Sequence, residues 1–184
     1  MVAYLLASLP TPQLGERPTI ELETFVERCR GFVSESRWHD LRALLGDWPA
    51  PASRPEVPDR RDPTARAWAD LAAQVEDAVA RERAARARRD ATSFLRQPSG
   101  YRVDVAEAVT RAFQLPDPAA RERSLDELRW RLADELALSG PAEFPELFAR
   151  AVQLRLAWRW ATWGVEDGRA ALEAALRQIE APHG

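Results

Sequence analysis

The sequence contains no lysine and no asparagine, and isoleucine occurs only at Ile20 and Ile179. All 26 basic residues are therefore arginine. The avoided residue types share A- and T-rich codons, so a genome with a strong GC bias explains the excess of arginine and alanine. A chain without lysine has no Walker-type phosphate loop and no lysine that forms a Schiff base. The sequence by itself therefore excludes a conventional nucleotide hydrolase.

Cysteine and histidine are also scarce. Cys29 is the only cysteine, which excludes an internal disulfide framework. Its helical spacing with Phe25 and Val26 is typical of a buried, unreactive thiol. The only histidines are His39 and His183, and no Gly-rich phosphate loop, Ser-His-Asp set or Cys-x-x-Cys pair occurs. We therefore expect no enzyme: no catalytic residue, no cofactor and no metal site.

The length and charge indicate an ordinary globular protein. A chain of 184 residues, 46% hydrophobic and 30% charged, buries roughly 70% of its unfolded surface as one domain or two small lobes. The net charge of -3 gives no general case for binding nucleic acid or an anionic membrane. The opening MVAYLLASLP is too short to span a bilayer and lacks the features of a secretory signal. We therefore expect a cytoplasmic protein.

Helical signals dominate, and they predict an all-α, multi-helix bundle. The Asp-Pro pair at 62 and 63 predicts a helix start, and this helix should continue to about Arg96. An extended conformation is an alternative only for the segment Val2–Leu9. Further helix starts are predicted at Thr19, at Ser34 or Ser36, at Asp104, at Asp117 with Pro118, and at a capping box formed by Ser124 and Glu127. A last helix is predicted over Val165–Ile179.

Proline marks the best candidate boundary in the chain. Four prolines lie between Trp48 and Asp62, a composition typical of a stiff, extended connector. We therefore divide the chain into an N-terminal helical segment (1–45), a Pro-rich connector (46–62) and a main helical bundle (63–184). The bundle either stands apart from residues 1–45 or packs with them as one domain.

The stretch from Phe144 to Trp163 predicts a helix with two apolar faces. Such a helix is either sandwiched between neighbouring helices or presents one face to another protein. Large aromatic residues anchor interfaces, and Trp158 continues the regular stripe of Leu147, Ala151 and Leu154. We therefore predict that the opposite side is a protein interface, formed by Trp160, Trp163 and Leu156 together with Arg155 and Arg159.

An arginine-rich segment allows a second kind of partner. Between Arg81 and Arg96 there are six arginines against Glu82 and Asp90, a local excess of +4. Such a segment either follows a phosphate backbone or forms a solvated helix face. No aromatic residue occurs in it before Phe94 and the whole chain is acidic, so the sequence favours the solvated face.

Two parts of the chain resemble a known family. The blocks YLLASLPTPQLG, PTIELETFVERC, LDELRWRLADEL and FPELFARAVQLRLAWRW resemble the bacterial family called domain of unknown function 2764, whose members are encoded among V-type (A/V-type) ATPase subunits. That family is similar in turn to a shortened form of the ATPase's C-type (in eukaryotes d-type) subunit. The resemblance covers roughly 4–45 and 124–180. Leu147, Ala149, Leu154, Arg159 and Trp160 match, whereas Arg150 and Trp158 replace a usual Tyr and a usual acidic residue.

The resemblance implies a non-catalytic subunit, or an accessory or assembly protein, of a bacterial V-type ATPase. The C-type subunit is a helical funnel that couples the central rotor stalk to the membrane proteolipid ring, so the implied partners are the stalk or the ring. The implied location is cytoplasmic, peripheral to the inner membrane through these partners, with neither nucleic acid nor a small-molecule substrate. Two alternatives stay open: a free-standing or self-associating helical adaptor, and a helical protein that binds nucleic acid.

Overall fold

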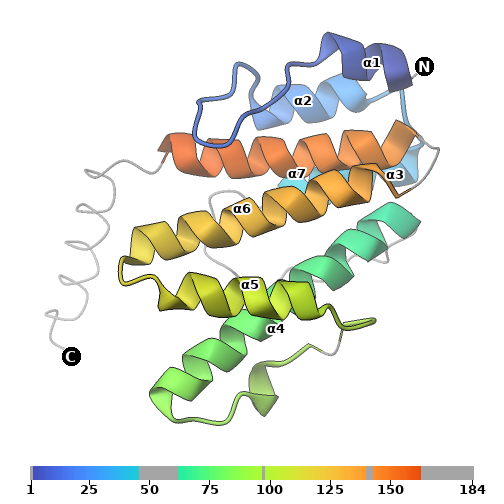
Figure 1. Ribbon diagram of the computed structural model, residues 1–184. Helices are drawn as coiled ribbons and strands as arrows, with labels where there is room; N and C mark the ends of the chain where they lie inside the picture. Colours follow the sequence, from blue (N-terminus) through green and yellow to red (C-terminus); the bar gives the residue numbers. More distant parts are fainter. Residues whose placement is uncertain (1, 46–61, 97, 140–142, 163–184) are drawn as a thin grey trace, which may run out of the picture.

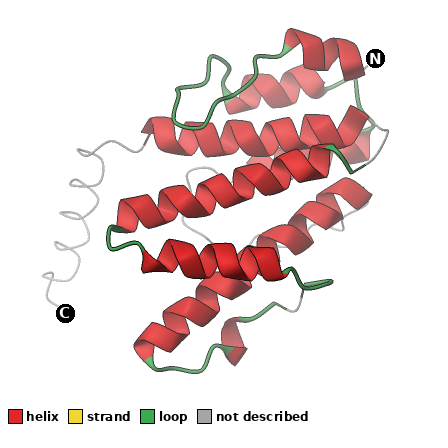
Figure 2. Ribbon diagram, in the orientation of Figure 1, coloured by secondary structure: helices red, strands yellow, loops and turns green. Residues whose placement is uncertain are grey.

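The structure is a computed structural model that describes residues 2–45, 62–96, 98–139 and 143–162. Within these residues the chain forms seven α-helices, one short 3-10 helix and no β-strand (Figure 2). The predicted all-α multi-helix bundle is thus confirmed. No helix in the described ranges is both long and apolar enough to cross a membrane. The helix predicted over Val165–Ile179 lies outside these ranges.

The helices stack around α7, which occupies the middle of the molecule. In Figure 1, α7 lies between α1 and α2 on one side and α6 on the other, and α3 packs behind it. Helix α5 lies beside α6, and α4 crosses both. The helices are α1 (Val2–Ser8), α2 (Leu22–Cys29), α3 (Glu35–Leu45), α4 (Pro63–Ala87), α5 (Val103–Gln114), α6 (Pro118–Ala137) and α7 (Glu143–Thr162), and the 3-10 helix η1 (Thr92–Phe94) follows α4.

The buried side chains form two hydrophobic cores. The first core joins α1, α2 and α3 to α7 and to Ala133 and Leu136 of α6. The second core lies between α4, α5 and the other buried leucines of α6. Trp68 of α4 packs against both. Residues 2–45 therefore share a core with the main bundle, although the sequence left open whether they stand apart. Of the predicted connector 46–62, residues 46–61 lie outside the described ranges.

The N-terminal helices differ in detail from the sequence prediction. Val2–Ser8 is helical and not extended, and its helical turn buries Leu5 and Leu6 against the first core. Helix α2 begins at Leu22 and not beside Thr19, and Glu21 at its N-cap makes no side-chain capping bond. Ile20 is instead buried, and its carbonyl accepts a hydrogen bond from Trp158 Nε1 at 2.9 Å.

The predicted start of α4 is confirmed, because Asp62 accepts a hydrogen bond from the Thr64 amide at 2.8 Å. Its predicted end near Arg96 is wrong. The helix stops at Ala87 because Arg88 adopts the left-handed conformation (φ 53°, ψ 44°) and redirects the chain.

Two further helix starts were predicted at the wrong residue. Helix α5 begins at Val103, and Asp104 pairs with Arg102 instead of capping the helix. The capping box at Ser124 is also wrong. Helix α6 is continuous from Pro118, because the carboxylate of Asp117 accepts the amides of Ala119 and Ala120.

Candidate functional site

Both apolar faces of α7 are covered by the chain itself. Leu147 and Leu154 on one side are 0% and 1% exposed, and Val152 and Leu156 on the other are 2% and 8% exposed. All four belong to the first core. Of the two explanations that the sequence allowed for a two-faced helix, packing between neighbouring helices thus accounts for these four residues. Leu156, named as an interface residue, is a core residue of the folded chain.

A buried carboxylate accounts for two more residues of the predicted interface. Asp126 of α6 is fully buried, and Arg159 Nη1 donates to its two oxygens at 2.7 and 2.9 Å. Trp160 Nε1 donates to the same carboxylate at 3.0 Å, and Arg129 Nη1 at 2.6 Å. Glu122 accepts a further bond from Arg159 at 2.9 Å. We call these five residues the Asp126 cluster, which joins α6 to α7.

The remaining predicted interface residues are placed differently. Arg155 Nη1 donates to the Leu44 carbonyl at 2.6 Å and so ties α7 to the end of α3. Trp163 lies outside the described ranges. The half-buried ring of Trp160 also lies 5.2 Å from the Arg123 guanidinium. The described members of the set thus bind within the chain, and their contact with a partner stays a prediction.

Sequence reasoning missed Asp126, although Arg159 and Trp160 were both singled out. The partners of Asp126 on α7 lie 33 and 34 residues further along the chain, so no local spacing connects them. The one available signal was its position within the Leu125–Leu128 stretch of an amphipathic helix. A carboxylate at such a position is buried only when cations accompany it.

The thiol and the histidine carry no site. Cys29 is fully buried, and this burial raises the pKa of its thiol to about 12, which keeps it protonated and unreactive. His39 is exposed and lies 3.3 Å from Glu35. Across the described ranges, no three His, Cys, Asp or Glu side chains gather where they could hold a metal ion. His183 lies outside them.

The chain that follows α4 turns back along it, and we call the described residues 88–96 and 98–102 the return segment. One face of α4 holds this segment through three side chains. Asp77 Oδ1 accepts the Arg96 amide at 3.0 Å, and Asp70 Oδ1 accepts the Ser99 amide at 3.3 Å. Gln74 donates to the Ser99 carbonyl at 3.2 Å and accepts the Arg102 amide at 2.9 Å. These bonds fix the position of a segment that has little regular structure.

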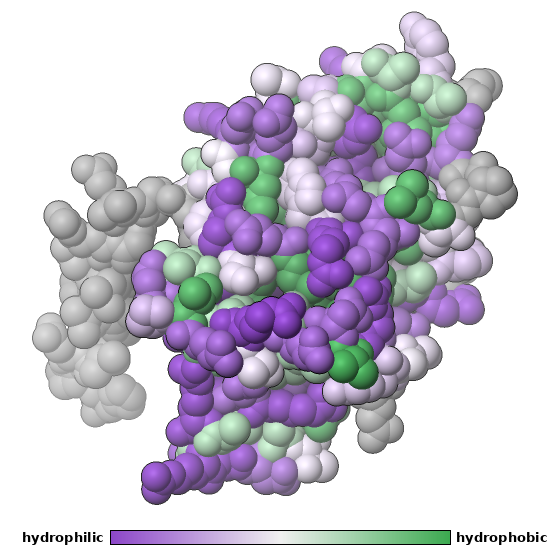
Figure 3. Space-filling model, viewed as in Figure 1, coloured by the Kyte–Doolittle hydropathy of each residue, from purple (hydrophilic) through white to green (hydrophobic). Residues whose placement is uncertain are grey.

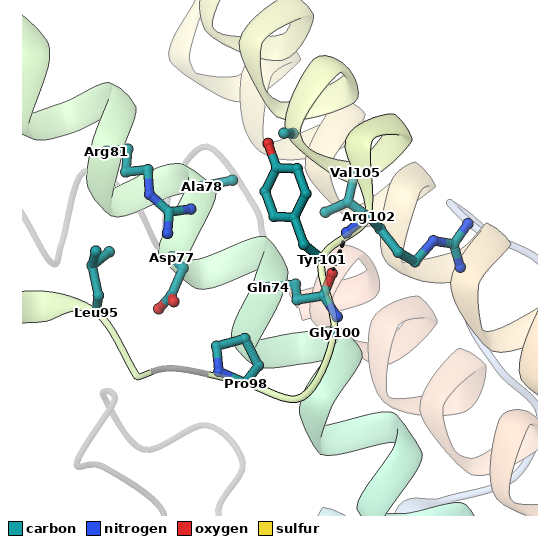
Figure 4. Close-up of a pocket in the computed structure, with 11 residues that line it drawn as sticks. Gln74, Asp77, Ala78, Arg81, Leu95, Pro98, Gly100, Tyr101, Arg102 and Val105 are labelled. Carbon is teal, nitrogen blue, oxygen red and sulfur yellow. Dashed lines mark hydrogen bonds between the residues drawn. The ribbon is translucent and has the colours of Figure 1, made fainter.

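A cavity of about 190 Å³ lies between this face of α4, the return segment and α5. In Figure 4, Asp77 and Arg81 project from α4 on one side of it, and Tyr101 stands beside Val105. Asp77 is only 2% exposed, whereas Tyr101 is 69% exposed. The cavity has room for one side chain of a ligand and is smaller than the 300 Å³ or more that is usual for small-molecule sites.

The six arginines from Arg81 to Arg96 fall into two groups, and of these six only Arg81 is among the residues that line the cavity. Arg86 donates to the Phe113 carbonyl, Arg96 pairs with Glu76, and Arg83 lies 4.0 Å from Glu122. The exposed side chains of Arg81, Arg88 and Arg89, by contrast, have no carboxylate within 4.0 Å in the described part of the chain. Figure 3 shows mainly hydrophilic atoms over α5 and the adjoining part of α4, and separate small hydrophobic patches. The sequence favoured such a solvated face.

Comparison with known proteins adds no relative to this description. No protein-family model, no curated protein and no solved structure matches the chain. The resemblance to the ATPase-associated family therefore rests on the four matching sequence blocks alone.

Proposed function

We propose that this protein is a non-catalytic accessory or assembly subunit of a bacterial V-type ATPase, similar to a shortened C-type subunit. It acts through helix-surface contacts with the central stalk or the proteolipid ring. The proposal rests on the sequence resemblance over roughly 4–45 and 124–180, and on the way in which these two parts of the chain pack.

The observation that carries the proposal is that the two resembling parts form one structural unit. They are separated by the dissimilar middle of the chain, yet α1, α2 and α3 pack with α7 and the end of α6 in the first core. The second core contains α4 and α5, where no resemblance was found, together with Leu125, Leu128 and Leu132 of the resembling block in α6. A shared family core with a divergent middle is the pattern expected of a distant relative.

The surface of this unit offers a place for a partner. A hollow of about 500 Å³ lies beside α2 and the end of α1, and its lining includes Leu9, Thr24 and Arg28. Tyr4 of α1 is 75% exposed, and exposed tyrosine is typical of binding surfaces. Both features belong to the first resembling part. We place the ATPase contact here, and we retain Trp160 and Trp163 as predicted contacts.

The test is purification of the tagged protein, expressed at its natural level, from its own cells. Stalk and ring subunits of the V-type ATPase should co-purify in fixed ratios and should be identified by mass spectrometry. A tagged protein that elutes alone, while the ATPase is intact in the same membranes, would contradict the proposal.

A matched pair of variants locates the contact. Thr24→Arg places a large cation beside the hollow, and Thr110→Arg makes the same change at an exposed position of α5. We expect Thr24→Arg to abolish co-purification and Thr110→Arg to leave it unchanged, with equal helix content in both. Equal recovery of the ATPase with both variants would remove the contact from this surface.

A further inference from the structure

We infer that α4 and the return segment form a docking surface for an acidic peptide segment of a partner protein, whose carboxylates bind Arg81, Arg88 and Arg89. We call these three residues, together with the cavity that Arg81 lines, the arginine surface. The inference does not depend on the proposed ATPase function, because it rests on a different part of the molecule.

The first argument is the row of polar side chains on α4. Asp70, Gln74, Asp77 and Arg81 are spaced by four, three and four residues, which places them on one helix face. The first three hold the return segment by hydrogen bonds. Arg81 continues the row, lines the cavity and has no carboxylate within 4.0 Å in the described part of the chain. Its guanidinium is therefore available to an acceptor from outside.

The second argument is the conformation of Arg88. It is the one non-glycine residue with positive φ in the described ranges, in a conformation that costs roughly 1–2 kcal/mol for a residue with a Cβ. Glycine is usual at this position after a helix. An arginine at any position in the last turn would interact favourably with the helix dipole. The dipole therefore does not explain why an arginine occupies the strained position 88. Strained residues gather at functional sites, and Arg88 and Arg89 place two guanidinium groups at the turn.

The third argument is charge complementarity. A guanidinium binds a carboxylate through two parallel hydrogen bonds, so three arginines without carboxylate partners fit an acidic chain. The cavity that Arg81 lines is also lined by Leu95 and Val105 and has room for one aliphatic side chain. A partner segment with several carboxylates and one apolar anchor fits both features.

The same surface is less suited to nucleic acid. The carboxylate of Asp77 lines the cavity, and Glu76 and Glu82 flank the arginines on α4. A continuous phosphate backbone would meet these negative charges, whereas a peptide places its carboxylates only where the arginines are. The net charge of -3 also opposes a polyanion at long range.

Fluorescence anisotropy with two labelled probes tests the inference. The first probe is a short glutamate-rich peptide with one central leucine, and the second is a single-stranded oligothymidylate of equal charge. At physiological salt we expect the peptide to bind more tightly than the oligonucleotide. Replacing its leucine by glutamine should weaken binding about tenfold, which is the loss expected when about 1.4 kcal/mol of apolar contact is removed. Tighter binding of the oligonucleotide would overturn the inference.

A pair of triple variants supplies the control on the protein. Replacement of Arg81, Arg88 and Arg89 by Gln should abolish peptide binding while helix content stays the same. Replacement of the exposed Arg17, Arg42 and Arg111 by Gln changes the net charge equally but lies elsewhere, and it should weaken binding less than threefold. If both triple variants lost peptide binding equally, the attraction would depend on net charge alone and the inference would be refuted. Absence of binding by the unmodified protein would also refute it. Neither result bears on co-purification with the ATPase.

Discussion

The carboxylate of Asp126 is the most heavily engaged charge in the molecule's interior, and replacing it by Asn should be strongly destabilising. Arg159, Arg129 and Trp160 all donate to it at 2.6–3.0 Å. Removing one member of a buried ion pair leaves the other uncompensated, which costs about 3–5 kcal/mol. Urea unfolding should therefore show a loss of that size for Asp126→Asn.

The control for this variant is an exposed ion pair. Glu107 and Arg111 lie 3.7 Å apart on α5, with side chains 64% and 65% exposed. Glu107→Gln should change the free energy of unfolding by less than about 1 kcal/mol. If Asp126→Asn cost no more than this control, the cluster would contribute little to holding α7 against α6.

Asp104 predicts a contribution to stability that disappears in acid. The hydrogen bond from Arg102 lowers the pKa of Asp104 from 3.8 to about 2. A carboxyl whose pKa is lower in the folded state stabilises the protein above its unfolded pKa, and this stabilisation is lost as the pH falls from about 4 to about 2. The side chain is 46% exposed, so screening by water reduces the effect.

Urea titrations at several pH values below 5 measure this contribution. Asp104→Asn should make the decline in unfolding free energy towards low pH shallower than in the unmodified protein. Arg102→Gln removes the two shorter hydrogen bonds to the carboxyl and keeps the longer one from Arg131, at 3.3 Å. It should make the decline shallower over the same pH interval. If the slope of unfolding free energy against pH were unchanged in both variants, the pair with Arg102 would not be what lowers the pKa of Asp104.

At the scale of a single helix, the carboxyl end of α4 is strained, and Arg88→Gly should relieve the strain. Glycine adopts positive φ without a steric penalty, so we expect the free energy of unfolding to rise by about 1 kcal/mol. Arg83→Gly, inside α4, should instead lower it by about 1 kcal/mol. Arg88→Gly should at the same time weaken binding of the acidic peptide, since a guanidinium is lost. A less stable Arg88→Gly variant would contradict the assigned conformation.

Among the helix starts, those with an Asp-Pro pair were predicted at the right residue, whereas the starts of α2 and α5 were not. The Asp-Pro pairs at 62 and 117 cap α4 and α6 because an aspartate oxygen reaches free amides at the first turn. The end of α4 was missed because Arg88 lacks the usual glycine signal. The capping box at Ser124 was overridden because the helix had already begun at Pro118. A local capping motif thus sets a helix boundary only where the helix has not already begun at an earlier motif.

The candidate sites were less predictable than the helices, because they depend on contacts between distant residues. Periodicity identified both faces of α7 but could not show that neighbouring helices cover them. The arginine excess between Arg81 and Arg96 was visible, whereas the return segment that brings Leu95 and Tyr101 to the cavity lined by Arg81 was not. These arrangements arise only when α4 ends at Ala87 and the chain turns back.

At the scale of the whole molecule, the first core is built from the two ends of the described chain. The hydrogen bond from Trp158 to the Ile20 carbonyl spans 138 residues, and Arg155 reaches Leu44 across 111 residues. Contacts of such sequence separation slow folding because loop-closure entropy is lost before they form, and these two join the N-terminal part of the chain to α7. Helix α6 contributes to both cores, so the two cores should unfold together.

The last prediction separates the chain at its Pro-rich connector. Expressed alone, residues 63–184 would expose the face of α7 that α1, α2 and α3 cover, including Leu154 and Trp158. We expect this fragment to bind a hydrophobic dye and to unfold without a sharp transition, because much of the first core is missing. Co-expressed with residues 1–45 as a second chain, it should form a stoichiometric complex with a cooperative transition.

A protease site placed within 46–61 gives the control: cleavage of the folded full-length protein should leave both pieces associated in gel filtration. A fragment 63–184 that unfolds as sharply as the full-length chain would show that the second core is self-sufficient and that residues 1–45 are an attached lobe.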